Sequence, residues 1–215
     1  MKMGKTFKRY MIAVLAFVFI GIGSAFTIKA NIGLGAWDAI ANSVANLFHA
    51  KIGTIGMIFN CSCIAGQLVI LRTKFRPVQL LQIPVSILLG TVVNFVFYNL
   101  LTFPLDNYIL RIIVCVGSLL FVAFAVSVIM IVDAITCPLE AFCMALTDVL
   151  PFKFHVLRQA ADVLCILAVF VLTLVFKVPL TLGLGTIIGM LIFGPALGKF
   201  MKMLYPVMKR MGLTA

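Results

Sequence analysis

Four carboxylates and their neighbours are the residues of this 215-residue chain that could do chemistry in an otherwise apolar sequence. Asp38 and Glu140 each stand near the start of a short amphipathic segment, and Asp162 follows Arg158 by one helical turn. Carboxylates in apolar surroundings are costly and typical of ion or substrate pathways. The sequence therefore predicts a pathway lined by eight candidates: Asp38, Glu140, Asp133, Asn31, Trp37, Asn60, Asp162 and Arg158.

Several of these candidates also have a structural alternative. A carboxylate in the first turn of a helix stabilises that helix by about 0.3 to 1 kcal/mol, which could explain Asp38 and Glu140. Arg158 and Asp162 could form a structural ion pair near the cytoplasmic end of a span. Trp37 could be an anchor at the membrane interface or an aromatic wall of a substrate site.

The candidates recur at a spacing of 102 residues, which indicates an internal repeat. At this spacing four acidic residues of the second half fall on Asn or Asp in the first: the pairs are Asn31 with Asp133, Asp38 with Glu140, Asn46 with Asp148, and Asn60 with Asp162. Asn and Asp occupy seven of the first 102 positions, so four independent coincidences have a probability of roughly two in 100,000. We therefore predict a duplicated unit of about 100 residues.

The composition places this unit in a membrane. Hydrophobic residues make up 64% of the chain and charged residues 11%, whereas soluble domains carry about 25% charged residues. Six apolar stretches are long enough to cross a hydrocarbon core, which takes about 20 residues of helix. They lie near residues 9–30, 54–72, 78–101, 109–132, 156–176 and 180–199. Their continuous apolar character predicts helices rather than a barrel.

Three spans in each unit place the second copy upside down relative to the first. We therefore predict an all-α polytopic membrane protein whose six transmembrane helices form two inverted three-helix repeats. Its expected parts are a cytoplasmic N-terminus (1–8), transmembrane repeat 1 (9–103), transmembrane repeat 2 (109–205) and a cytoplasmic tail (206–215). Many secondary transporters use inverted repeats to alternate the access of a central site.

Each repeat should also contain a short helix between its first and second spans. In the first repeat, the glycines at residues 31–35 interrupt the chain before residues 36–48 resume a helical pattern. In the second repeat, Thr136 can cap a helix that has Pro138 in its first turn. Two geometries remain open: re-entrant half-helices whose N-termini face a cavity at mid-membrane depth, or amphipathic helices that lie on the membrane surface.

The positions of the basic residues predict the topology. If the N-terminus is cytoplasmic, 13 of the 17 Lys and Arg residues lie inside, and four lie outside: Lys29, Lys51, Arg111 and Lys177. Both termini should therefore be cytoplasmic. Membrane lipids are the expected partners of these residues. Nucleic acid is not, because the basic residues flank spans and form no continuous patch. A second copy of the chain, in a homodimer, is a further candidate partner.

No cofactor, metal site or enzymatic activity is predicted. Cys61 and Cys63 point to different sides of one helix, and Cys137 and Cys143 flank a short helix without a neighbouring His. These spacings favour small buried side chains over a disulfide framework or a metal site. The sequence also lacks a Ser/His/Asp, metal or phosphate-cradling constellation, which argues against an enzyme.

Four segments carry a resemblance to a known family. They are residues 28–38 (Ile-Lys-Ala-Asn-Ile-Gly-Leu-Gly-Ala-Trp-Asp), residues 53–56 (Gly-Thr-Ile-Gly), residues 82–86 with Gly90, and residues 185–186 with 194–195. Over nearly its whole length the chain resembles the YczE/YyaS/YitT group of bacterial multi-pass membrane proteins. The resemblance implies the fold and a bacterial inner-membrane location, and it supplies no catalytic residues. Asn94 stands where an acidic residue is expected in such proteins, which weakens an ion-pathway role for this position.

Together these features favour a secondary transporter of an unidentified small molecule or ion. Coupling to protons or cations would involve Asp38, Asp133, Glu140 and Asp162, with Asp38 and Glu140 as functional equivalents on opposite sides of the access route. One alternative is the substrate-binding subunit of an energy-coupling-factor-type importer, although the first span lacks the Ala-x-x-x-Ala pattern by which such subunits dock. A non-transport accessory membrane protein is the third hypothesis.

Overall fold

The computed structural model describes residues 2–214, with side chains described from Lys5 onward. This part of the chain is all-helical and contains no strand. Its α-helices are α1 (Lys2–Ala30), α2 (Ala36–Leu47), α3 (Ile52–Leu71), α4 (Gln82–Phe95), α5 (Tyr108–Val132), α6 (Pro138–Leu146), α7 (Phe154–Phe176) and α8 (Leu184–Arg210). Short 3-10 turns at Arg72–Lys74 and Pro77–Leu81 join α3 to α4, and a π-helical turn at Val96–Leu100 extends α4. Six of these helical stretches are long and apolar enough to cross a membrane, as predicted.

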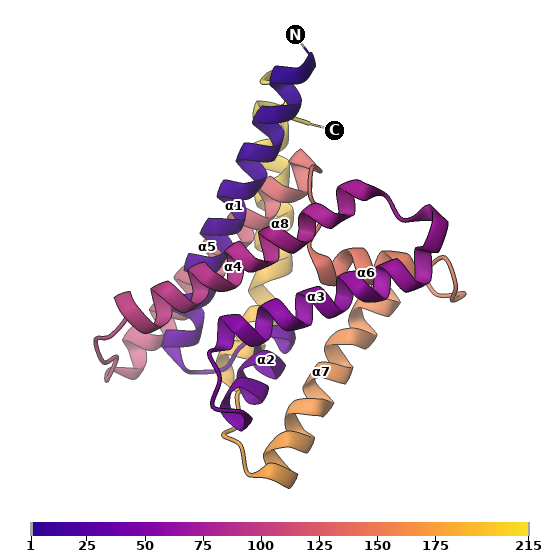
Figure 1. Ribbon diagram of the computed structural model, residues 1–215. Coiled ribbons are helices and arrows are strands. Elements are labelled where there is room, and N and C mark those ends of the chain that lie inside the picture. The colour runs from indigo at the N-terminus through magenta and orange to yellow at the C-terminus, as the bar shows by residue number, and fades with distance from the viewer. Residues whose placement is uncertain (1, 215) are drawn as a thin grey trace.

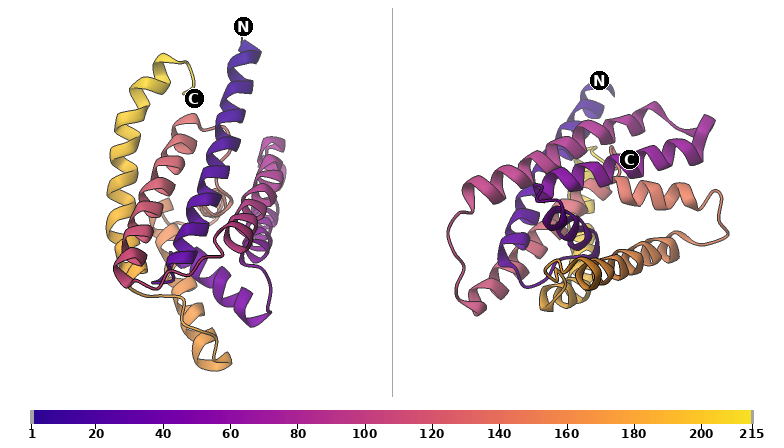
Figure 2. Two further views of the ribbon diagram at one scale, coloured as in Figure 1. Left: turned by 90° about the vertical axis from the view of Figure 1, so that its left-hand side faces the viewer. Right: turned by 60° about the horizontal axis from the view of Figure 1, so that its bottom comes forward.

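The long helices form a row in which each packs on the next. The order is α8, α5, α1, α4 and α3, with α5 between α8 and α1, and the α3–α4 hairpin crossing α1 (Figures 1 and 2). Helix α7 diverges from α8 and packs instead on the two short helices. The two ends of the chain lie at the same end of the bundle (Figure 1), as an even number of spans requires.

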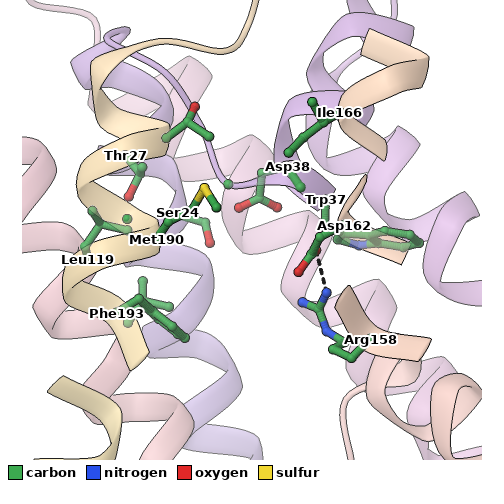
Figure 3. Close-up of a pocket in the computed structure, with 15 residues that line it drawn as sticks. Ser24, Thr27, Trp37, Asp38, Leu119, Arg158, Asp162, Ile166, Met190 and Phe193 are labelled. Carbon is green, nitrogen blue, oxygen red and sulfur yellow. Dashed lines mark ion pairs between the residues drawn. The ribbon is translucent and has the colours of Figure 1, made fainter. Parts of the chain in front are cut away.

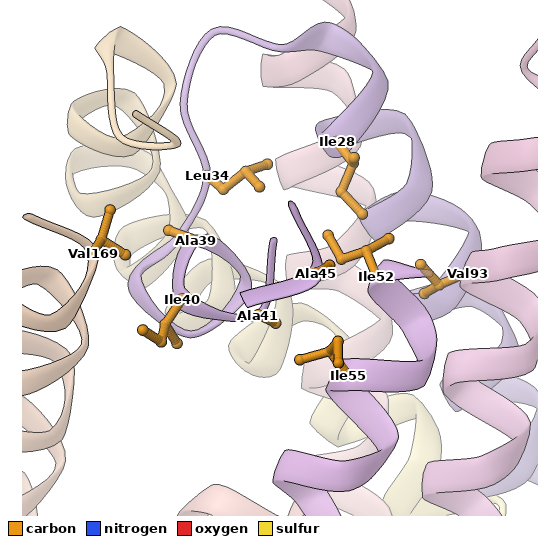
Figure 4. Close-up of a cluster of buried hydrophobic side chains, with 10 residues drawn as sticks. All are labelled: Ile28, Leu34, Ala39, Ile40, Ala41, Ala45, Ile52, Ile55, Val93 and Val169. Atoms are coloured by element: carbon orange, nitrogen blue, oxygen red, sulfur yellow. The ribbon is translucent and has the colours of Figure 1, made fainter. Parts of the chain in front are cut away.

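The short helices α2 and α6 fill the space between α3 and α7, and each of them contacts both of these long helices. Helix α2 buries a face of small residues, which lets its backbone approach its neighbours closely. A cluster of buried apolar side chains surrounds it (Figure 4). Its members are Ile28, Leu34, Ala39, Ile40, Ala41, Ala45, Ile52, Ile55, Val93 and Val169. Helix α2 is therefore part of the core.

Gly53 and Gly90 bring α3 and α4 together. A Cβ atom on either glycine would collide with the carbonyl oxygen of the other. The amide of Gly53 also donates a hydrogen bond of 2.8 Å to Oδ1 of Asn94. The positions 102 residues later carry His155 and Ile192, and α7 and α8 make no comparable contact within residues 2–214. The close contact of α3 with α4 therefore has no counterpart between α7 and α8 in the described part of the chain.

Asn31 and Asp133 end α1 and α5 in the left-handed conformation, with φ angles of 49° and 46°. Asn and Asp adopt this conformation more readily than most other residues, so helix termination accounts for this pair. The guanidinium of Arg9 donates a hydrogen bond of 2.6 Å to the carbonyl of Val132 and thus caps the C-terminus of α5.

The predicted starts of the last span and of the second short helix are wrong. The last span was predicted from residue 180, but α8 begins at Leu184, because the segment before it is extended and bonds to the loop before α2. The amide of Leu34 donates to the carbonyl of Thr181 at 3.1 Å, and the amide of Gly185 to that of Ile32 at 2.7 Å. In α6 the N-cap is Cys137 rather than Thr136, and the helix ends at Leu146.

Candidate functional site

The first turn of α2 is held in place by residues of the second half of the chain. Asp38 is the third residue of this helix. The hydroxyl of Thr186 donates a hydrogen bond of 2.7 Å to the carbonyl of Leu34, and that of Thr181 donates one of 3.0 Å to the carbonyl of Ala39. These bonds tie the loop before α2 and the first turn of α2 to the segment before α8 and to its first turn.

The first turn of α6 is held in the reciprocal way by residues of the first half. Glu140 is the third residue of this helix, after Pro138 and Leu139. The amide of the Gln67 side chain donates to the carbonyl of Pro138 at 3.1 Å and to Oε1 of Gln82 at 3.1 Å. Gln67 and Gln82 are both buried. The two carboxylates are thus positioned by side chains from the opposite half of the protein.

A cavity of about 330 Å³, here called cavity A, lies between α7 and α8, with α1 and α5 behind it. Asp38 projects from α2 into this space, between a wall formed by Met190 and Phe193 and a wall formed by α7 (Figure 3). On the α7 wall, Asp162 pairs with Arg158 (Figure 3). Cavity A therefore lies in the gap between α7 and α8, which do not pack on each other in the described part of the chain.

A second cavity of about 210 Å³, here called cavity B, lies between the α3–α4 hairpin and the α1–α5 pair. Asn60, which is 7% exposed, and Glu140 line it. Five residues line both cavities and form the boundary that we call the septum: Ser24, Trp37, Asp38, Val122 and Arg158. The two cavities are thus adjacent compartments with a shared acidic boundary.

The charges around the septum do not balance. Nε of Arg158 lies 3.3 Å from Oε1 of Glu140, and the same guanidinium forms an ion pair with Asp162. Asp38 has no hydrogen bond or ion pair from its carboxylate in the described part of the chain. Arg158 therefore pairs with two carboxylates, and a third, Asp38, lines the same two cavities without a counter-ion.

The structure brings six of the eight predicted residues together and leaves two apart. Those that line cavity A or B are Trp37, Asp38, Asn60, Glu140, Arg158 and Asp162. Asn31 lines a separate polar cavity beside Asn42 and Asn46, and Asp133 is exposed and lines none of the four described cavities. Both act as helix ends, which explains their positions.

Sequence reasoning missed the contact between Arg158 and Glu140, and the walls formed by Ser24, Met190 and Phe193. The only signal for the contact was the presence of a basic residue inside a span, which needs a partner. All six cysteines are free. Among the described residues, no group of three or more His, Cys, Asp or Glu side chains could hold a metal ion.

Comparison with known proteins gives one match. No curated protein and no solved structure is similar enough to the chain to match it. Residues 7–202 match a family of unknown function, DUF6198. Because this match spans the six apolar helices and both cavities, the chain belongs to the DUF6198 family of proteins of unknown function.

Proposed function

We propose that this protein is a secondary transporter of a small solute in the bacterial inner membrane, and that it works by alternating access between two inverted three-helix repeats. The proposal rests on the shared location of Asp38 and Glu140. Each is the third residue of a short helix, the two helices come from different halves of the chain, and both side chains line cavity B. Paired half-helices that aim their N-termini at a central site are typical of such transporters.

The helix contacts support an inverted repeat because each contact made by a helix of one half has a counterpart made by the equivalent helix of the other half. Helix α2 contacts α7, and its counterpart α6 contacts α3; likewise α1 contacts α4, and α5 contacts α8. The counterparts α1 and α5 pack on each other. The exception is that α3 packs closely on α4, whereas α7 stands away from α8. Alternating access requires such a difference, since one half is closed while the other is open.

The polar contacts of α2 and α6 support a re-entrant rather than an interfacial position. Non-helical backbone at membrane depth is tolerated only where it is buried in protein or lines a cavity. The loop before α2 meets both conditions. The carbonyl groups of Ile32 and Leu34 accept hydrogen bonds from Gly185 and Thr186, the amide of Leu34 donates to the carbonyl of Thr181, and Gly35 lines cavity A. Coupling to protons or cations would use Asp38, whose carboxylate has no partner in the described part of the chain.

The resemblance of residues 28–38 to the YczE/YyaS/YitT group supports the bacterial location, and the excess of basic residues on one side supports cytoplasmic termini. A lipid environment, an unidentified solute and a second copy of the chain are the partners that this proposal includes.

Two-sided labelling tests the proposal without knowledge of the solute. Ser24 lines both cavities, so Ser24→Cys in a variant without the native cysteines should react with a membrane-impermeant thiol reagent from either side. Intact cells and inside-out vesicles supply the two sides. Leu174→Cys is the control, because Leu174 is 79% exposed on a membrane-spanning helix and should face lipid. Labelling of Ser24→Cys from one side only would contradict alternating access and favour a static accessory protein.

A further inference from the structure

A third cavity adjoins the acidic site and is almost entirely apolar. This groove, of about 390 Å³, lies between α3 and α7 and is floored by α2 and α6. Its walls include Phe59, Phe142 and Leu164. Leu164 is 65% exposed, so the groove opens on the outer surface of two membrane-spanning helices. At this depth the surrounding medium is lipid.

Trp37 joins the apolar groove to the acidic site. It lines the groove, cavity A and cavity B, and its ring packs on that of Phe59 with centroids 5.6 Å apart. Asp38 is the next residue in the sequence and lines cavities A and B but not the groove. An apolar compartment and a compartment with excess negative charge thus share one aromatic wall.

We infer that the solute is an amphipathic organic cation, whose charged group binds at Asp38 while its apolar part occupies the groove beside Trp37 and Phe142. This inference rests on the proposed function and names the class of substrate. The septum supplies an uncompensated carboxylate for the cation, because Arg158 is already engaged by Glu140 and Asp162. The indole face of Trp37 adds attraction for a cation placed against it.

The volumes of the compartments limit the size of the substrate. Cavities of about 330 and 390 Å³ are at the small end of the range for ligand sites. They suit a compact ammonium group with one ring or a short chain. A purely hydrophilic cation would leave the groove unfilled, and a neutral apolar molecule would leave Asp38 unpaired.

Three related probes test this inference. Benzyltrimethylammonium has both features, tetramethylammonium has only the charge, and neopentylbenzene has only the apolar shape. Binding is measured by equilibrium dialysis of each radiolabelled probe against the protein in lipid nanodiscs, with empty nanodiscs subtracted. We expect benzyltrimethylammonium to bind at least about tenfold more tightly than either of the others. Tetramethylammonium lacks the ring, whose burial removes apolar surface from water, and neopentylbenzene lacks the charge that pairs with Asp38.

Two variants assign the halves of the probe to the two compartments. Asp38→Asn should weaken benzyltrimethylammonium at least about tenfold, as expected for loss of an ion pair with a desolvated carboxylate. Trp37→Leu should weaken benzyltrimethylammonium about fivefold or more and tetramethylammonium to a smaller extent, because the indole contributes both to the apolar groove and to the attraction for the cation. Phe142→Leu, on the far side of the groove, gives the same test if Trp37→Leu does not fold. Asp133→Asn, at an exposed helix end, is the control and should change nothing.

Equal affinity for benzyltrimethylammonium and tetramethylammonium, or binding that is insensitive to Asp38→Asn, would overturn the inference. The proposed function is tested by a different experiment, the labelling of Ser24→Cys. Labelling of Ser24→Cys from both membrane sides, together with failure of the probes, would leave alternating access in place and remove only the substrate class. Labelling from one side would remove the transport proposal itself.

Discussion

Asp38 and Glu140 occupy the same position in two short helices, and only one of them has a counter-ion. Glu140 lies 3.3 Å from Nε of Arg158, whereas the carboxylate of Asp38 has no ion pair in the part of the chain that the structure describes. Helix dipoles favour both carboxylates equally. The two acids are therefore equivalent in position and different in charge balance, so Asp38 is the candidate for titration and Glu140 the candidate for holding Arg158.

Arg158 should be needed for the stability of the acidic site. Arg158→Gln leaves Glu140 and Asp162 without their cation, and we expect a loss of about 1 to 3 kcal/mol, between the values for exposed and buried pairs. Chemical denaturation in detergent measures it.

The matched control for Arg158→Gln is Lys74→Gln. Lys74 pairs with Asp148 at 3.5 Å with 74% and 46% of the side chains exposed, so its loss should cost less than about 1 kcal/mol. The double variant Arg158→Gln with Glu140→Gln should regain part of the stability. Equal effects of the Arg158 and Lys74 variants would argue against an interior charge cluster.

Gly53 should tolerate no side chain. Gly53→Ala places a methyl group against the carbonyl of Gly90 and against Asn94, so α3 must move away from α4 at a cost of about 1 to 3 kcal/mol. Gly56→Ala, one turn later on the same helix, meets no atom within 4 Å and should be neutral or stabilising by up to about 1 kcal/mol. Thermal unfolding monitored by fluorescence compares the two. A stable Gly53→Ala protein would mean that α3 and α4 do not pack at this point.

Reporter fusions should place the termini together on the cytoplasmic side. A fusion after residue 213 and a fusion at Asp106, which lies in the connection between α4 and α5, should report opposite sides of the membrane. The basic residues motivate this orientation, and the two ends of the chain lie at the same end of the bundle. A C-terminus outside the cytoplasm would reverse the orientation of the pathway.

The six spans could be predicted from the sequence, because the bilayer requires continuous apolar runs. Six of the eight residues predicted for a pathway line the two adjacent cavities, and their role there stays a prediction. Asn31 and Asp133 show the limit of this reasoning. Their correspondence reflects the left-handed helix ends that both residues form, and a sequence pattern cannot separate such a backbone role from a role in a pathway.

The contacts between helices could not be predicted in the same way. The bond from Gln67 to the carbonyl of Pro138 and the ion pair of Arg158 with Glu140 join residues far apart in the sequence or on different helices. They depend on which faces of the helices meet. In a membrane, nearly every face is apolar, so hydrophobic periodicity does not identify the buried face as it does in a soluble protein.

The central claim is that α7 approaches α8 when α3 moves away from α4, and the reverse. Distances between paired spin labels measure this movement directly. Double electron–electron resonance would compare labels at Val171→Cys and Leu191→Cys, on α7 and α8, with labels at Val69→Cys and Ile87→Cys, on α3 and α4; all four side chains are exposed. With the native cysteines replaced, alternating access predicts two distances for each pair. When the population of the short α7–α8 distance rises, that of the short α3–α4 distance should fall. A single distance for each pair under all conditions, or changes in the same direction, would contradict the account.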